Sequence, residues 1–304
     1  MSSNIRNWEI DQERALQAEI RARLEVPHRR AREIIIRGGV QIAGKIVLDP
    51  GFRANIGDPV TVNTEPMKIR TALRKNFEQE MKILHKDRHL LVVHKPAGLL
   101  TVPTDEDERE ICLLGEISRK LRQNGEKRPA LFVIQRLDRF TSGVLSIART
   151  PEARDRLKQQ LKNRKFERRY VAICQGRKNL DEGICRLPLI EDPRTLKMRL
   201  ARKGETGKDA VTRWKMLEIR GEHSLIEAYL ETGRRNQIRV HLGAVGLPII
   251  GDSRYGVTSP WISRPALHAE SLSFHHPITM QELSFQVPLP EDMKLAWEAV
   301  ETAS

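Results

Sequence analysis

One aspartate in this chain stands between two arginines, in the run Arg136-Leu137-Asp138-Arg139. A guanidinium near a carboxyl group favours the ionised acid and lowers its pKa by about 1–3 units. An ionised carboxylate can act as a nucleophile or as a base. Apolar segments on both sides predict two strands, and the Thr-Ser-Gly that follows allows a tight turn between them. The alternative is a structural ion pair, because Arg–Asp pairs are common at such positions.

A second polar cluster begins at Arg234 and continues into a predicted helix over residues 237–245. On a helix, Gln237, Arg239 and His241 do not share one face, so they cannot all contact one ligand. Arg239 is the best candidate for the partner of a carboxylate, because its planar fork suits a bidentate pair. Arg234 suits a phosphate. The alternative is the basic start of an exposed helix.

A third candidate is Tyr170, in a predicted strand over residues 169–174. Strand alternation places Tyr170 and Ala172 on one face of the sheet, with Arg169 and Val171 on the other. A tyrosine in such a position can stack on a nucleobase or pass a proton through its hydroxyl. More often such a side chain is part of the core and its hydroxyl is hydrogen-bonded.

The elements that must position these residues are mostly strands. The sequence predicts a mixed α+β domain over residues 81–304, built on a mixed, mainly antiparallel sheet. The predicted strands are 83–84, 89–95, 131–134, 144–148, 169–174, 211–219, 223–232 and 272–287. One helix is predicted over residues 151–163, with its proline in the first turn.

The first segment, residues 13–64, has a different pattern. It predicts helices over 13–24 and 28–37, followed by short strands over 40–42, 45–48 and 59–62. Four arginines concentrate positive charge on and beside the second helix: Arg29, Arg30, Arg32 and Arg37. They form either a solvated helix face or a face that contacts phosphates. The polar residues 65–80 are the expected linker to the larger domain.

Composition narrows the class of partner. Among 304 residues there are 53 Lys and Arg against 40 Asp and Glu, a formal net charge of +13. That excess favours a polyanion, and nucleic acid is preferred over an anionic membrane because no Lys-rich amphipathic helix with a large aromatic face is evident. No apolar run approaches the roughly 20 residues of a membrane span, and the first residues do not resemble a secretory signal.

The remaining residue types argue against several other classes of site. The three cysteines are scattered, so neither a disulfide framework nor a zinc knuckle is expected, and a reducing cytoplasm is the expected compartment. The nine histidines show no metal-ligand spacing. We therefore expect no metal site.

The clusters taken together resemble the RluA-type pseudouridine synthases. The resemblance covers residues 81–290 in order, and the module before it resembles the S-four-like RNA-binding module through its basic helix and two glycine-marked turns. The runs that carry it are Ile83 to Leu100, the R-L-D-R-x-T-S-G run at 136–143, Tyr170-Val171-Ala172, Thr232-Gly233-Arg234, Gln237-Ile238-Arg239-Val240-His241, Pro248 to Asp252, Leu267-His268-Ala269, His276-Pro277 and Pro288-Leu289-Pro290; in the module they are Gly38 to Lys45 and Gly57 to Val62.

The resemblance implies isomerisation of uridine to pseudouridine in structured RNA, with ribosomal RNA the expected substrate and transfer RNA the alternative. Asp138 would be the catalytic carboxylate, acting as a nucleophile or by proton abstraction. Arg239 would keep it ionised, and Tyr170 would stack on the flipped base. In the catalytic domain the same resemblance implies RNA contacts for Arg136, Arg139 and Arg234. In the module it implies RNA contacts for Arg29, Arg30, Arg32 and Arg37. The resemblance also implies that no metal or nucleotide cofactor is needed. A monomer is expected.

Two positions depart from the family pattern, which has His before R-L-D and before Q-I-R. Here these residues are Gln135 and Asn236. Both keep hydrogen-bonding capacity but lack a titratable ring. They leave open a non-catalytic RNA-binding or ribosome-assembly protein on the same scaffold. A glycosidase is a weaker alternative, because no second carboxylate is placed near Asp138.

Overall fold

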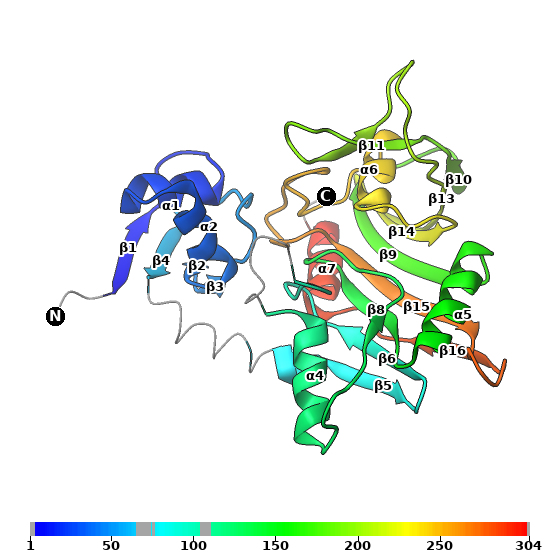
Figure 1. Cartoon of the computed structure of the whole chain (residues 1–304). Helices are drawn as coiled ribbons and strands as arrows, with labels where there is room; N and C mark the ends of the chain where they lie inside the picture. Colours follow the sequence, from blue (N-terminus) through cyan, green and yellow to red (C-terminus); the bar gives the residue numbers. More distant parts are fainter. Residues whose placement is uncertain (1–3, 65–73, 75–76, 104–110, 303–304) are drawn as a thin grey trace.

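Two units, each built of helices and strands, form the computed structural model (Figure 1), which describes residues 4–64, 74, 77–103 and 111–302. The smaller unit is N-terminal and the larger one carries the long sheet. The mixed α+β class predicted from the sequence is confirmed.

The N-terminal unit packs two helices on a four-stranded sheet. Its elements are β1 Ile5–Glu9, α1 Leu16–Leu24, α2 His28–Ile36, β2 Val40–Ile42, β3 Lys45–Ile46 and β4 Pro59–Asn63, with strand order β1-β4-β2-β3. Its own core is formed by buried side chains such as Ile20, Ile35 and Val60. Strand β1 belongs to this sheet although it precedes residue 13, the expected start of the module. The sequence analysis did not predict it, because it pairs with β4, which is distant in sequence.

The N-terminal unit contacts the larger one near the end of β3. Leu48 packs against the core of the larger unit. Asp49 Oδ2 accepts a hydrogen bond of 3.0 Å from Ser253 Oγ. The expected linker, 65–80, falls largely on residues 65–73 and 75–76, which lie outside the described part of the chain. Phe77, at its end, is already buried in the core of the larger unit.

The larger unit is organised by one long sheet with strand order β10-β13-β14-β9-β15-β8-β6-β5. Off this order, β16 pairs with β15 and β7 pairs with β8. Its strands are β5 Lys82–Lys86, β6 Leu90–Lys95, β7 Phe132–Val133, β8 Ser142–Ala148, β9 Glu167–Gln175, β10 Glu182–Cys185, β13 Thr212–Arg220, β14 His223–Leu230, β15 Leu267–His275 and β16 Glu282–Gln286. A separate hairpin is formed by β11 Leu189–Glu191 and β12 Met198–Leu200.

Among the described residues, the helices with full bounds beside the sheet are α4 Leu113–Gln123, α5 Pro151–Lys162, α6 Gln237–Ala244 and α7 Glu291–Thr302. The sequence analysis predicted α5 and α6 and missed the other two. Both missed helices carry buried apolar residues at helical spacing, for example Leu113, Ile117 and Leu121 in α4, because one face of each packs on the sheet.

Strand β15 is the junction of the sheet, since it lies between β9 and β8 (Figure 1). It pairs antiparallel with β9 and parallel with β8, where Ala269 is opposite Gly143. Gly143 has φ +126°, and a Cβ atom there would lie 2.2 Å from the Ala269 carbonyl oxygen. Only glycine therefore fits where the turn carrying Asp138 enters β8.

Candidate active site

Asp138 lies in the turn between β7 and β8, and the backbone of this turn is held from three sides. Thr101 Oγ1 donates to the Leu137 carbonyl at 2.8 Å and accepts from its N–H at 3.2 Å. The Arg139 carbonyl accepts from Lys95 Nζ at 3.0 Å. The Phe140 carbonyl accepts from an Arg264 guanidinium nitrogen at 3.2 Å. The carboxylate is thus carried by a rigid backbone, which favours a fixed geometry for chemistry.

Lys95 is fully buried at the end of β6. Its Nζ also donates to the carbonyls of Pro96 and Leu99, at 2.9 and 2.7 Å. Burial is the main cause that lowers the pKa of Lys95 well below its usual range; the positive charge of Arg264 adds to this effect, and the negative charge of Asp138 opposes it. Three carbonyl acceptors use all three donors of an ammonium group, so the hydrogen bonds favour the charged form.

Arg239 connects the turn to a second, deeply buried carboxylate. Its Nη1 is 3.4 Å from Asp138 Oδ2, while its Nε and Nη2 lie 2.6 and 2.7 Å from the two oxygens of Asp252. Burial alone would lower the pKa of Arg239, but the hydrogen bonds and charge of Asp252, aided by Asp138, raise it above the ordinary value. The guanidinium is therefore a permanent cation that Asp252 orients and Asp138 shares.

Asn236 also contacts the carboxylate. Its side-chain Nδ2 donates to Asp138 Oδ2 at 2.7 Å, a shorter contact than that of Arg239. The sequence analysis noted Asn236 as a departure from a family pattern and assigned it no contact. Its left-handed backbone, with φ 56° just before α6, directs the side chain to the turn. Asparagine adopts this conformation more readily than most residues do.

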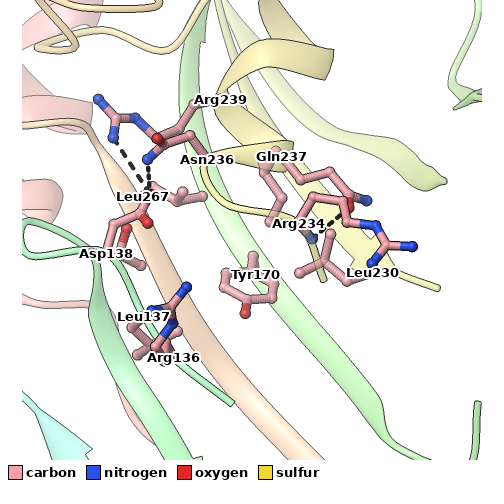
Figure 2. A pocket seen from close by; sticks show the side chains of 12 residues that line it. Arg136, Leu137, Asp138, Tyr170, Leu230, Arg234, Asn236, Gln237, Arg239 and Leu267 are labelled. Carbon is pink, nitrogen blue, oxygen red and sulfur yellow. Dashed lines mark hydrogen bonds and ion pairs between the residues drawn. The ribbon is translucent and has the colours of Figure 1, made fainter. Parts of the chain in front are cut away.

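The carboxylate faces a pocket into which Tyr170 of β9 projects (Figure 2). Tyr170 is mostly buried, and burial raises the pKa of its hydroxyl, as does the charge of Asp138, while Arg168 opposes the change. The pocket has charged, polar and apolar walls. Its lining residues are Arg136, Leu137, Asp138, Thr141, Tyr170, Leu230, Arg234, Asn236, Gln237, Ile238, Arg239 and Leu267.

The structure brings together five of the residues singled out from the sequence: Asp138, Arg239, Tyr170, Arg136 and Arg234. Both Arg136 and Arg234 are exposed at this pocket. As the helical spacing predicted, the third polar residue of α6 points elsewhere: the His241 ring contacts Thr212 Oγ1 and the Leu187 carbonyl. Gln237 and Arg239 do line the same pocket, because both lie in the first turn of α6, which faces it.

The remaining candidates lie apart from the pocket. Arg139 is not one of its lining residues. On α2, Glu33 pairs with Arg30 at 2.9 Å and with Arg37 at 2.8 Å, while Arg29 is exposed and Arg32 is half-buried. The phosphate-contacting role of these residues stays a prediction.

Sequence reasoning missed Lys95, Thr101 and Asp252 as supports of the site. Lys95 was visible as a lysine ending a strongly apolar strand, where a charge needs compensation. Asp252 follows Gly251 directly after the apolar run 247–250, and a charged residue at such a place was the available signal; in the structure its side chain is buried. Thr101 carried no such signal.

Two searches of the described residues gave negative results. These residues contain no group of three or more His, Cys, Asp or Glu side chains arranged to hold a metal ion. Within the same part of the chain, no helix is both long and apolar enough to cross a membrane.

A rigid acid–guanidinium pair beside an open, arginine-flanked pocket fits an enzyme site for an anionic substrate. The family model described as RNA pseudouridylate synthase matches residues 89–244. The chain is 35% identical over 306 residues to "Ribosomal large subunit pseudouridine synthase D" of Zymomonas mobilis, covering 96% of this chain and 93% of that protein. It is 38% identical over 240 residues to "Uncharacterized RNA pseudouridine synthase YhcT" of Bacillus subtilis, covering 78% of each. The chain therefore belongs to the RNA pseudouridylate synthase family and is an enzyme.

The fold agrees with this assignment. The structure of "Human RNA Pseudouridylate Synthase Domain Containing 4" superposes with a TM-score of 0.60 at 23% identity, covering 75% of this chain and 95% of that one. At this level of identity the likeness concerns the fold alone.

Proposed function

We propose that this enzyme isomerises specific uridines of ribosomal RNA to pseudouridine, with Asp138 as the catalytic carboxylate. The observation that carries the proposal is the position of Asp138. It is held at the wall of the pocket by Arg239 and Asn236, with Tyr170 also lining that pocket (Figure 2). The RNA class is supported by the names of the relatives, several of which are called large-subunit synthases.

The reaction requires that the target base leave its stack, which costs a few kcal/mol. The pocket offers the flipped base the ring of Tyr170 and the apolar side chains of Leu230 and Leu267. Asp138 then either attacks the anomeric carbon or takes a proton from the neighbouring ribose carbon. The bond between the anomeric carbon and N1 breaks, and its electrons stay on the uracil. After the uracil rotates, C5 bonds to the anomeric carbon: in the first route the bond from this carbon to Asp138 breaks, and in the second the neighbouring ribose carbon regains its proton. C5 then loses its proton and N1 gains one.

The electrostatics of the site suit this role. A carboxylate that attacks or abstracts a proton must be ionised, and Arg239 supplies a permanent positive charge at 3.4 Å. Asp252 uses the other two sides of the guanidinium, so Arg239 cannot swing away from the pocket without breaking two hydrogen bonds. Tyr170 stays protonated at neutral pH, since burial raises its pKa, and offers an intact phenol to the base.

We propose that arginines at the pocket and in the N-terminal unit bind the RNA. Arg136 and Arg234 flank the pocket and suit the phosphates beside the flipped nucleotide. A more distant part of a large, structured RNA would contact the arginines of the S-four-like module: Arg29, Arg30, Arg32 and Arg37. Two of these, Arg30 and Arg37, also pair with Glu33. We expect a monomer acting in the cytoplasm.

The test is pseudouridine formation in transcripts of large-subunit ribosomal RNA, read by mass spectrometry, with wild type and Asp138→Asn compared. The substitution removes the charge and keeps the size, so turnover is expected to be lost while RNA affinity stays within about twofold. Asp155→Asn, on the exposed face of α5, is the matched control. A fully active Asp138→Asn enzyme would refute the assigned role. RNA binding without any pseudouridine from the wild type would favour an RNA-binding or ribosome-assembly role instead.

A further inference from the structure

Among the described residues, two side chains donate hydrogen bonds to the Asp138 carboxylate, and both bonds end on the same oxygen. Asn236 Nδ2 lies 2.7 Å and Arg239 Nη1 lies 3.4 Å from Oδ2 (Figure 2). Because of the distances, the amide of Asn236 is the tighter of the two restraints. With Oδ2 anchored, rotation of the carboxylate is blocked, and Oδ1 is the oxygen left for a substrate.

The orientation of the Asn236 amide is itself fixed by Tyr255. The Tyr255 hydroxyl donates to Asn236 Oδ1 at 3.2 Å and accepts from the Met198 N–H of β12 at 3.1 Å. The Tyr255 oxygen accepts a hydrogen bond from the Met198 N–H, and the single proton of the hydroxyl is donated to Asn236 Oδ1. If the amide were reversed, its oxygen would face the Asp138 carboxylate. The contact with Tyr255 therefore selects the orientation in which the amide donates to Asp138.

Tyr255 also contacts the second restraint. The Arg239 guanidinium carbon lies 4.8 Å from the centre of the Tyr255 ring, a cation–π geometry. The ring and the hydroxyl thus serve different partners: the ring packs on Arg239, and the hydroxyl bonds Asn236. Replacing Tyr255 by Phe separates these two contributions, because the ring stays in place.

We propose that Asn236 and Tyr255 are positioning residues that anchor Oδ2 of Asp138 and leave Oδ1 as the reacting oxygen. This inference rests on the proposed function, because it requires Asp138 to carry the reaction. On this proposal, Asn236 does more than fill the place of the histidine in the family pattern. Its uncharged amide restrains the Asp138 carboxylate without placing a second cation beside Arg239. Tyr255 acts through Asn236 and does not touch the substrate.

The test uses single-turnover pseudouridine formation together with the RNA Kd, measured at one salt concentration. Asn236→Gly deletes the side chain and suits the left-handed backbone at φ 56°. Asn236→Asp keeps the size and removes the donor. A hydrogen bond to a charged group contributes about 1.5–3 kcal/mol, so both variants are expected to react about 10–100-fold more slowly, with the Kd within twofold of wild type. Met280→Gly makes the same kind of backbone change at φ 60° outside the pocket and is the control.

Tyr255→Phe is expected to slow the reaction by about 2–10-fold, as a neutral hydrogen bond does. Because Tyr255 acts through Asn236, the double variant with Asn236→Gly should be no slower than Asn236→Gly alone, within about twofold. Asn236→His restores an N–H donor and should recover most of the rate lost in Asn236→Gly.

Three results would overturn the proposal: Asn236→Gly and Asn236→Asp within twofold of the wild-type rate, a loss that appears in the Kd instead of the rate, or multiplicative effects in the double variant. If Asn236→Gly does not fold, Asn236→Asp and Tyr255→Phe decide by the same criteria. Failure of the proposed function is separate, since it would appear as an inactive wild type or an active Asp138→Asn.

Discussion

Replacing Asp252 by Asn tests whether a buried ion pair orients Arg239. The side chain of Asp252 is 1% exposed and that of Arg239 is 10% exposed. Removing one partner of a buried pair costs about 3–5 kcal/mol, because the other charge is left uncompensated. Asp138 remains as a second anion near Arg239, and Asn keeps one acceptor oxygen, so we expect the lower end, about 3 kcal/mol.

The assay is urea unfolding followed by circular dichroism, with the free energy of unfolding obtained by linear extrapolation. A loss of about 3 kcal/mol corresponds to a Tm lower by about 6–12 °C for a domain of this size. The rate of pseudouridine formation should also fall by at least about tenfold, because the guanidinium loses the two hydrogen bonds that direct Nη1 to Asp138.

Two further variants make the result specific. Asp155→Asn removes the same charge at an exposed pair on α5 and should leave stability and rate unchanged. Combining Arg239→Met with Asp252→Asn removes both charges, so part of the lost stability should return while the enzyme becomes slower still. An Asp252→Asn protein within about 0.5 kcal/mol of wild type would refute the reasoning, because a buried, bidentate partner cannot be that dispensable.

Three other predictions concern the support of the site. Lys95→Met should slow pseudouridine formation in single-turnover assays with little change in RNA Kd, because the Arg139 carbonyl loses its donor. Gly143→Ala should lower the free energy of unfolding in urea by about 3 kcal/mol or more, since its Cβ would meet the Ala269 carbonyl at 2.2 Å. Burial is the main cause that lowers the pKa of His268 to about 3, so between pH 6.5 and 3 the unfolded chain binds a proton that the folded chain does not. Stability should therefore fall on acidification through this range, by up to about 1.4 kcal/mol per pH unit, and less so in His268→Asn. Equal urea midpoints at pH 5 and 7.5 in the wild type, or equal pH slopes in the two proteins, would contradict this.

The sequence was sufficient to select the central residues of the site. Asp138 stood out because two arginines flank it, and Arg239 because its planar guanidinium suits a bidentate pair with a carboxylate, a pairing that the structure gives to Asp252 while Asp138 receives one contact. Asp138 and Arg239 are separated by 101 residues in the sequence, and the fold of the sheet brings them together. Local sequence patterns do not encode such a contact. Tyr170 was placed by strand alternation, and it does line the pocket. Their catalytic roles stay a proposal.

What the sequence could not provide is the layer of residues behind the site. Asp252 and Lys95 support it through buried contacts that only the assembled fold creates. Asn236 was noticed only as an exception to a pattern, although its amide is the tightest contact of the carboxylate. Helices α4 and α7 are a different case, because their apolar spacing was present in the sequence and predicts an amphipathic helix.

The position of β15 has a consequence for synthesis of the protein on the ribosome. Asp138 precedes β8 and Tyr170 lies on β9, and in the described sheet β15, residues 267–275, lies between these two strands and pairs with both. A nascent chain that has not yet released this strand holds two unjoined halves of a sheet and no assembled pocket. Contacts of such long sequence separation also form slowly. The pocket therefore cannot assemble before residues 267–275 have been synthesised, and a chain that stops short of them is expected to be inactive.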